Sequence, residues 1–237
     1  MKINLGIIKF VTILALVVFL FGFANNRNNH RKIAKIDIAF LDDNNPFITG
    51  KTVNKLLIQN SSDTVNIGKE RLVLKEIEDR LQNNPMIKKA DVYLTIDGQL
   101  HALIKQRKPI ARVLGSPNYY IDEDGKKMPL SQVYSARVPL VTGFNKKEKT
   151  IVLLLNKIQE DAFFKKMIVG VKISPNGNIA AKCRKHDFII DFGRPIDLDR
   201  KFQNFKAFYH KTKQDSSLFS YNKISLKFGN QVIATKK

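Results

Sequence analysis

The chain has 237 residues, of which 43% are hydrophobic, so it can form folded cores and is not a disordered chain. Lysine and arginine number 41 against 21 acidic residues, and the net charge of +20 favours anionic partners such as nucleic acid, anionic lipid or acidic wall polymers. These basic residues are scattered along the chain, which equally fits an ordinary basic surface. The single cysteine, Cys183, excludes an internal disulfide, and its position in a predicted strand indicates a core residue.

The N-terminus begins with a long apolar segment. Leu5–Ala24 is almost entirely apolar and spans about 20 residues, the length that crosses the hydrocarbon core as a helix. A cleaved signal peptide is the alternative, but its apolar region runs to only about 7–15 residues. We therefore expect a retained transmembrane helix over residues 5–24, a short cytoplasmic tail at 1–4 and a polar linker at 25–34. Basic residues flank both ends of the segment, so charge alone does not orient it.

Residues 35–107 show the pattern of a small α+β domain. Apolar alternation marks strands, a four-residue apolar spacing marks helices, and Asp97-Gly98 is a hairpin signal. The expected elements are a strand at Ile36–Phe40, helices at Gly50–Gln59 (capped by Thr49) and Lys69–Asn83, and strands at Ala90–Ile96 and Leu100–Ile104.

Residues 108–237 predict a second, β-rich domain with an antiparallel sheet and flanking helices. Strands are expected at Pro109–Leu114, Tyr119–Asp122, Val138–Thr142, Ile168–Ile173, Asn178–Arg184 and Phe188–Phe192, with a last strand within Tyr221–Ala234. Helices are expected at Lys147–Glu160 and from Asp197 onward. The fold class is therefore α+β, behind an N-terminal transmembrane helix.

Residues that could carry catalysis or bind a metal are sparse. The four histidines, His30, His101, His186 and His210, have no metal-ligand spacing to each other or to Cys183. Asp122, Asp124 and Gly125 resemble the start of a calcium loop, but lysines follow and no glutamate closes it, so a turn is expected. No phosphate-binding glycine loop or nucleophile elbow is present. We expect no catalytic, metal or cofactor site and no enzymatic activity.

Two features bear on binding. The phenylalanines fall mostly on apolar faces and do not interleave with the basic residues, which argues against specific nucleic-acid binding. The final strand, within Tyr221–Ala234, can form a sheet edge to which a partner adds a strand. The alternative is an edge that is covered or protected by charge, with Lys223 and Lys227 as the protecting residues.

Several stretches, taken in order, resemble the bacterial cell-division family FtsQ/DivIB over essentially the whole chain. The most specific is Lys105-Gln106-Arg107-Lys108-Pro109-Ile110-Ala111-Arg112, which is similar to the family's junction between its POTRA and β domains. The others are Asn45–Thr49, Ile77–Leu81, Asn84–Val92, Tyr119–Asp122, Asp124-Gly125 and Arg137–Gly143. The strand-helix-helix-strand-strand order of residues 35–107 resembles a POTRA domain.

The resemblance implies a non-enzymatic, single-pass scaffold of the inner membrane. Its N-terminus would be cytoplasmic, and its POTRA domain (35–107) and β domain (108–237) would lie on the periplasmic side, at the division septum. Its partners would be FtsB- and FtsL-like divisome proteins, held near the C-terminal strand. The expected partner contacts, taken from this resemblance and the edge, are Arg194, Tyr221, Lys223, Ser225, Lys227, Phe228 and Asn230.

Two other functions stay open from the sequence. A POTRA-bearing envelope assembly or secretion component would continue into a series of barrel strands of about 10 residues, which this sequence lacks. A basic envelope protein that binds anionic polymers would show steeply salt-dependent binding.

Overall fold

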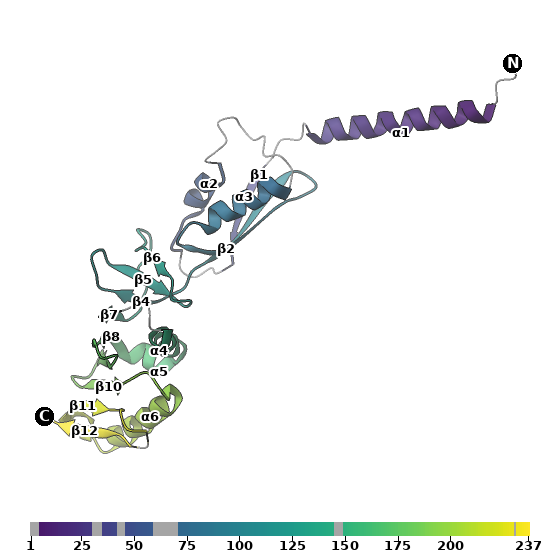
Figure 1. Ribbon diagram of the computed structural model, residues 1–237. Coiled ribbons are helices and arrows are strands. Elements are labelled where there is room, and N and C mark those ends of the chain that lie inside the picture. Colours follow the sequence, from purple (N-terminus) through teal and green to yellow (C-terminus); the bar gives the residue numbers. More distant parts are fainter. Residues whose placement is uncertain (1–4, 30–34, 42–45, 59–70, 145–148, 230) are drawn as a thin grey trace. The chain divides into compact units, whose positions relative to one another are not determined.

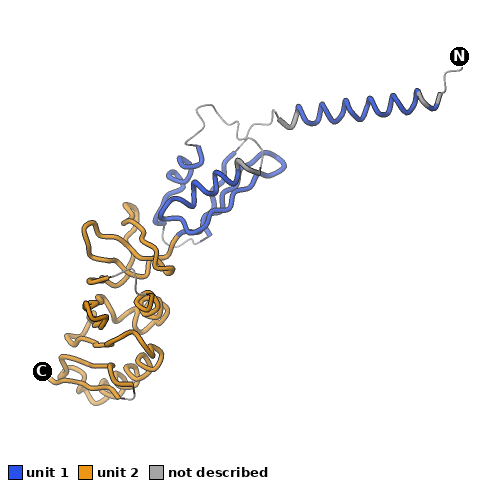
Figure 2. The backbone as a smooth tube through the Cα atoms, viewed as in Figure 1, with its two compact units in different colours: residues 1–106 blue, residues 107–237 orange. Residues whose placement is uncertain are grey.

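The computed structural model describes residues 5–29, 35–41, 46–58, 71–144, 149–229 and 231–237. The chain divides into two compact units, residues 1–106 and residues 107–237 (Figure 2). Each unit has its own sheet and is described by itself.

Unit 1 begins with helix α1, Leu5–Asn29 (Figure 1). Its segment Ile8–Asn26, of 19 residues, is long and apolar enough to cross a membrane, and none of that segment is buried by protein. Such an exposed apolar helix is stable where lipid surrounds it. The helix includes residues 25–29, which the sequence places in the linker. Asparagine and arginine there do not break a helix as proline or glycine would.

The rest of unit 1 is a three-stranded sheet with two helices on one face (Figure 1). The elements are β1 (Lys35–Phe40), α2 (Gly50–Ile58), α3 (Arg71–Gln82), β2 (Ile87–Leu94) and β3 (Gln99–Gln106). The strand order is β1-β3-β2, with β1 parallel and β2 antiparallel to β3. This is the predicted order of elements. Lys69, Glu70 and Gln59, at the predicted helix ends, lie outside the described residues.

Local signals account for the ends of these elements. The Thr52 N–H donates to Thr49 Oγ1 at 3.2 Å, which confirms Thr49 as the cap of α2. Gly98 has φ +86° in the β2–β3 hairpin, the left-handed backbone that the Asp97-Gly98 signal predicts. The buried Gln106 accepts hydrogen bonds from the Phe47 and Ile48 N–H groups at 2.8 and 3.3 Å. This side chain therefore attaches the segment before α2 to the end of β3.

Unit 2 is built on a nine-stranded sheet of order β12-β11-β10-β9-β8-β7-β4-β5-β6. The strands are β4 (Pro109–Val113), β5 (Tyr119–Asp122), β6 (Lys127–Met128), β7 (Leu140–Thr142), β8 (Ile168–Ile173), β9 (Ile179–Cys183), β10 (Ile189–Gly193), β11 (Tyr221–Ser225) and β12 (Ile233–Lys236). The helices are α4 (Lys149–Glu160), α5 (Ala162–Met167), α6 (Leu198–Gln214) and the short 3₁₀ helix η1 (Ser217–Ser220).

This sheet is mixed, and the expectation of an antiparallel sheet is wrong in that respect. The pairs β4–β7, β7–β8 and β10–β11 are parallel. Helices α4 and α5 carry the chain from β7 to β8, and α6 carries it from β10 to β11. A connection of this length returns the chain to the same end of the sheet, so the strands it joins run parallel.

The core of unit 2 lies between the sheet and α4, α5 and α6, which occupy one side of the sheet (Figure 1). The middle of the sheet's contribution is one row of paired residues: Val141, Val171, Ala181, Ile190 and Ile224. Aromatic side chains fill the helical side, and Phe164 and Phe202 have ring centroids 4.1 Å apart. Cys183 is buried there, as predicted, and burial raises its pKa to about 12.

Two local predictions for unit 2 need correction. Helix α5 is absent from the prediction, although Asp161 is its N-cap and accepts from the Phe163 and Phe164 N–H groups at 3.0 and 3.2 Å. The predicted final strand is two strands, β11 and β12, joined by residues 226–232. Alternation of Ile224, Leu226 and Phe228 suggested continuity, but the chain leaves the sheet after Ser225.

The predicted turn at Asp122–Gly125 is present, and it joins β5 to β6, a short strand that the sequence analysis did not predict. The Gly125 N–H donates to Asp122 O at 2.9 Å, and Asp122 Oδ1 accepts from the Lys126 N–H at 2.6 Å. The other carboxylate oxygen pairs with Arg107 Nη1 at 2.7 Å. Asp122 is fully buried, and both of its carboxylate oxygens are bound by groups of the protein.

Candidate partner-binding surface

The face of the unit 2 sheet opposite its helices is open from β7 to β12. Strand pairing aligns two rows of side chains on this face, because alternate residues of a strand point to the same side. The first row is Leu140, Gly170, Lys182, Ile189, Lys223 and Thr235. The second row is Thr142, Lys172, Ala180, Asp191, Ser225 and Ile233. These two rows are called the open face below.

The open face combines positive charge with exposed apolar side chains. Lys172, Lys182 and Lys223 are exposed, and Leu140, Ile189 and Ile233 have 44, 47 and 43% of their surface accessible. Asp191 is the acidic residue in the two rows. Apolar and basic groups side by side suit an amphipathic, acidic binding partner.

Asp191 organises the centre of this surface. Its Oδ2 accepts from Lys223 Nζ at 2.9 Å and Lys227 Nζ at 3.1 Å, and its Oδ1 accepts from the Gly193 N–H at 3.1 Å. Burial raises the pKa of Asp191, but the two lysines and the Gly193 N–H outweigh that effect and hold the pKa below its usual value. The carboxylate is therefore ionised, and it fixes both lysine side chains over the sheet.

Arg194 follows β10 at the same end of the sheet as Lys227. The preceding Gly193 has φ +61°, and a Cβ there would lie 2.8 Å from Lys227 Cγ. Behind this turn, the buried Lys201 donates from Nζ to Phe192 O and Arg194 O, both at 2.7 Å. Burial lowers the pKa of Lys201, while Asp197 and Asp191 oppose the effect. These contacts fix the backbone at Arg194, whose side chain is exposed, directly after the glycine that adjoins Lys227.

Strand β12 is the edge of the sheet. It pairs with β11 on one side, and no strand of the described part of the chain pairs with its other side. An unpaired edge offers N–H and C=O groups to an added strand. Its own exposed lysine is Lys236, whereas Lys223 and Lys227 lie inward and are directed to Asp191. They therefore do not protect the edge in the way considered from the sequence.

The predicted contact residues occupy different environments. Lys223 and Ser225 lie on the open face, Arg194 and Lys227 lie at its end, and Phe228 is 50% exposed in the connection between β11 and β12. Tyr221 is half-buried, with its ring centroid 5.7 Å from that of Phe208 on α6. A register shift between Tyr221 and Lys223 turns Tyr221 toward the helix. Asn230 lies outside the described residues.

Sequence reasoning missed Asp191, Ile189 and the exposed Ile233 and Lys236 of β12. Alternation along the predicted strand Phe188–Phe192 carried a signal, because it sets Ile189 and Asp191 opposite the buried Ile190. For β12 the signal was weak, because four residues are too few to show a period.

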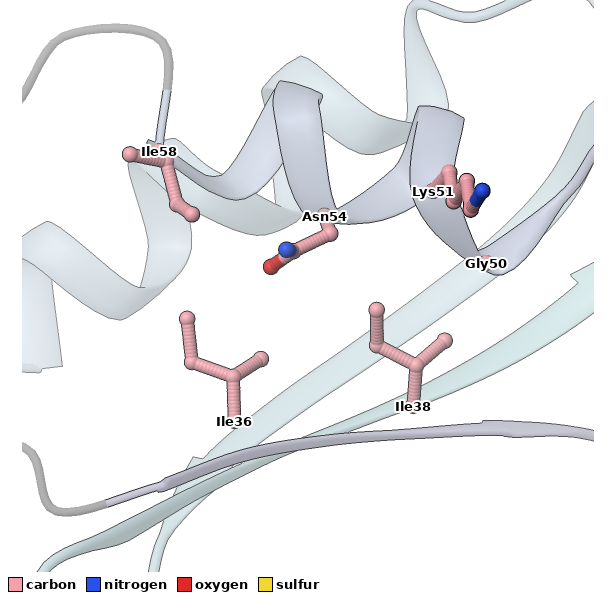
Figure 3. A pocket seen from close by; sticks show the side chains of 6 residues that line it. All are labelled: Ile36, Ile38, Gly50, Lys51, Asn54 and Ile58. Atoms are coloured by element: carbon pink, nitrogen blue, oxygen red, sulfur yellow. The ribbon is translucent and has the colours of Figure 1, made fainter.

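Unit 1 has a groove of its own, beside its edge strand β1. Ile36 and Ile38 project from β1 toward α2, where Asn54 and Ile58 face them across a volume of about 470 Å³ (Figure 3). Among the described residues that line it, three are isoleucines and one, Lys51, is charged, whereas the open face presents several exposed lysines. The candidate site is therefore placed on unit 2.

The groups on the open face are ones that can bind a polypeptide. Among the described residues, no group of three or more histidine, cysteine or acidic side chains could hold a metal ion. Cys183 is buried and its raised pKa keeps the thiol protonated, so it is a poor nucleophile. Backbone edge, lysine side chains and exposed apolar groups can together hold a polypeptide.

Comparison with protein families matches both units of the chain. Residues 108–235 match the model described as FtsQ/DivIB, C-terminal related, and residues 32–105 match that of a POTRA-like domain. A search of curated proteins found no match. The first match covers more than half of the 237 residues, and the second coincides with the three-stranded unit that follows α1. FtsQ/DivIB proteins are non-enzymatic scaffolds of bacterial cell division. The chain, with one candidate membrane helix, a POTRA-like domain and a mixed-sheet domain, belongs to the FtsQ/DivIB family.

Proposed function

We propose that this protein is a non-enzymatic scaffold of the bacterial divisome that binds FtsB- and FtsL-like membrane proteins through its β domain during septum formation. In this proposal α1 crosses the inner membrane once, with residues 1–4 in the cytoplasm and residues 25–237 outside. Family membership supports the general role, and the geometry of unit 2 supports the mode of binding.

The observation that carries the proposal is the edge strand β12 beside the open face, whose outer side pairs with no strand among the described residues. A partner segment in extended conformation would pair its backbone with Ile233–Lys236 and so continue the sheet. Residues flanking that segment would then lie across the open face. Ile233, Ile189 and Phe228 supply exposed apolar contacts for them.

Charge favours an acidic partner segment. Arg194, Lys182 and Lys172 have exposed side chains, and Asp191 neutralises only part of the charge of its two lysines. Opposite charges across an interface speed encounter and suppress wrong partners. The rate of association should therefore fall as the salt concentration rises, because exposed charges more than about 8 Å apart are largely screened at physiological ionic strength.

The membrane helix would add to the affinity. If the partners are also single-pass proteins, confinement to one membrane raises the effective concentration of each for the other. A moderate interface on the β domain is then sufficient, because part of the entropic cost of association is already met.

Co-purification of FtsB- and FtsL-like proteins with the full chain from cell membranes tests the binding site. Ile233→Glu should reduce recovery by about tenfold or more, since it places a charge at the edge against an apolar and acidic partner. Leu153→Glu is the matched control, because Leu153 is similarly exposed, at 51%, but lies on α4 on the other side of the sheet. Undiminished recovery with both Ile233→Glu and Phe228→Ala would exclude this surface.

The cellular role has a separate test. A fluorescent fusion of the full chain should form a band at midcell that requires both α1 and unit 2. A fusion that distributes evenly around the membrane, while the protein remains folded and abundant, would contradict a divisome function.

A further inference from the structure

A small pocket lies on the helical side of unit 2, away from the open face. Its volume is about 200 Å³, and it is formed by α5, α6 and the connection between β9 and β10. Three aromatic rings and three basic side chains line it: Phe163, His186 and Tyr209, with Lys166, Arg184 and Lys185. The proposed partner-binding surface includes none of the residues that line this pocket.

Contacts between the aromatic rings fix one side of the pocket. His186 stacks on Phe188 with centroids 5.0 Å apart and planes 10° apart, and Tyr209 meets His186 and Phe163 edge-on at 5.6 and 5.0 Å. A hydrogen bond of 3.2 Å joins His186 Nε2 and Tyr209 Oη. Rings held in this way offer a preformed apolar surface, so a bound ring would not have to order them.

The three basic side chains have no acidic counterpart in the described part of the chain. Arg184 donates from Nε to Lys166 O at 3.3 Å, which ties its side chain to the end of α5. The nearby carboxylates are engaged elsewhere: Asp161 pairs with Lys206, and Asp187 pairs with Lys237 at 3.3 Å. The positive charge at the pocket is therefore left for an external anion.

His186 does not add to this charge at neutral pH. Burial lowers its pKa, and Lys185 and Lys213 lower it further against the opposing effect of Asp187. The neutral imidazole belongs to the apolar wall, whereas Arg184 presents a planar fork of donors that matches a carboxylate or phosphate.

We propose that this pocket binds a small organic anion, namely a carboxylate or phosphate carried on a single ring or a body of similar size. The size follows from the volume, because pockets for drug-sized ligands enclose about 300–1,000 Å³. The ring lies against Phe163 and Tyr209, and the anionic group pairs with Arg184 and the neighbouring lysines.

The test uses the full chain in a neutral detergent and four probes. Phenyl phosphate and benzoate carry both ring and anion, benzyl alcohol lacks the charge, and inorganic phosphate lacks the ring. Binding is followed by NMR through the His186 ring signal, which is identified among the four histidines by its loss in His186→Gln. Phenyl phosphate and benzoate should shift this signal saturably, and the other two probes should bind at least about tenfold more weakly.

Arg184→Gln should weaken phenyl phosphate by about tenfold, the equivalent of one charge-assisted hydrogen bond. Lys172→Gln, which removes the same charge from the open face, should leave the dissociation constant unchanged. If Arg184→Gln unfolds the domain, Lys185→Gln repeats the measurement, since the exposed Lys185 side chain has no described hydrogen bond to lose. Equal binding of inorganic phosphate and phenyl phosphate, or no effect of either variant, would overturn the proposal.

Discussion

Asp191 of β10 and Lys223 of β11 form an ion pair of 2.9 Å across two parallel strands, beside the edge of the sheet. The same carboxylate holds Lys227 at 3.1 Å, in the segment that leads to β12. One buried acid thus joins three successive parts of the candidate binding surface, and its removal should affect both stability and binding.

Asp191→Asn should destabilise unit 2 by about 1–3 kcal/mol, because it leaves two lysines without their counter-ion. The amide oxygen of the new side chain can still accept the hydrogen bond from the Gly193 N–H. Hydrogen exchange should show the loss in β10 and β11. Asp187→Asn is the control: it breaks the exposed pair with Lys237 and should cost no more than about 1 kcal/mol. Equal protection in the two variants would mean that Asp191 does not organise this surface.

The same residue predicts a pH dependence. The pKa of Asp191 lies below its usual value in the folded protein, where the two lysines and the Gly193 N–H outweigh the effect of burial. Its stabilising contribution is therefore complete above the unfolded pKa, about 3.9, and is lost as the pH falls through the folded pKa. Unfolding measured from about pH 6 down to pH 2 should show a shallower acid limb in Asp191→Asn than in the wild type. An identical acid limb would contradict the assignment.

Gly193→Ala should cost about 1–2 kcal/mol in stability, because Gly193 has φ +61° and a non-glycine residue is strained there. The new Cβ would also displace Lys227, whose Cγ lies 2.8 Å from its position, and should reduce partner recovery. Gly170→Ala is the matched control on the same face, since its Cβ would meet nothing nearer than 3.6 Å. Partner recovery equal to wild type in Gly193→Ala would show that the placement of Lys227 is unimportant.

Lys201→Met tests the support of the Arg194 turn. It keeps the buried aliphatic stem but removes the donor to Phe192 O and Arg194 O. Arg194 O still accepts from the Ile196 N–H at 2.9 Å, so the cost of about 1–3 kcal/mol comes mainly from the buried Phe192 O, which loses its charged donor. Amide exchange at residues 193, 194, 196 and 197 should quicken more than in α4, which serves as the internal reference. Unchanged exchange in the turn would mean that other contacts hold Arg194.

The net charge of +20 gives a further prediction. Binding of the full chain to duplex DNA should fall steeply with salt and vanish near about 0.15 M, as expected of contacts through phosphates alone. Partner binding should persist under those conditions, because backbone pairing and apolar contacts are not screened. DNA binding that survives physiological salt would instead favour the polyanion-binding alternative.

Local features of this sequence predicted most elements because each depends on residues close together in the chain. Val53 and Leu57 mark the buried side of α2, Thr49 caps it, and Asp97-Gly98 closes the β2–β3 hairpin. Helix α5 was missed despite its Asp161 cap, because six residues are too few for a helical period. The last strand was drawn too long because alternation does not reveal where a chain leaves the sheet.

The sequence by itself determined the apolar helix at the N-terminus, the two-domain order and the resemblance to FtsQ/DivIB, since these follow from hydropathy, local periodicity and motifs in series. Only the tertiary structure decided that β12 is the edge, that Tyr221 turns toward α6, and that Lys223 and Lys227 meet at Asp191. Asp191 lies more than thirty residues before Lys223, with α6 between them. Pairing over such a separation depends on how α6 packs and on the strand register it imposes, and no local pattern in the sequence encodes that register.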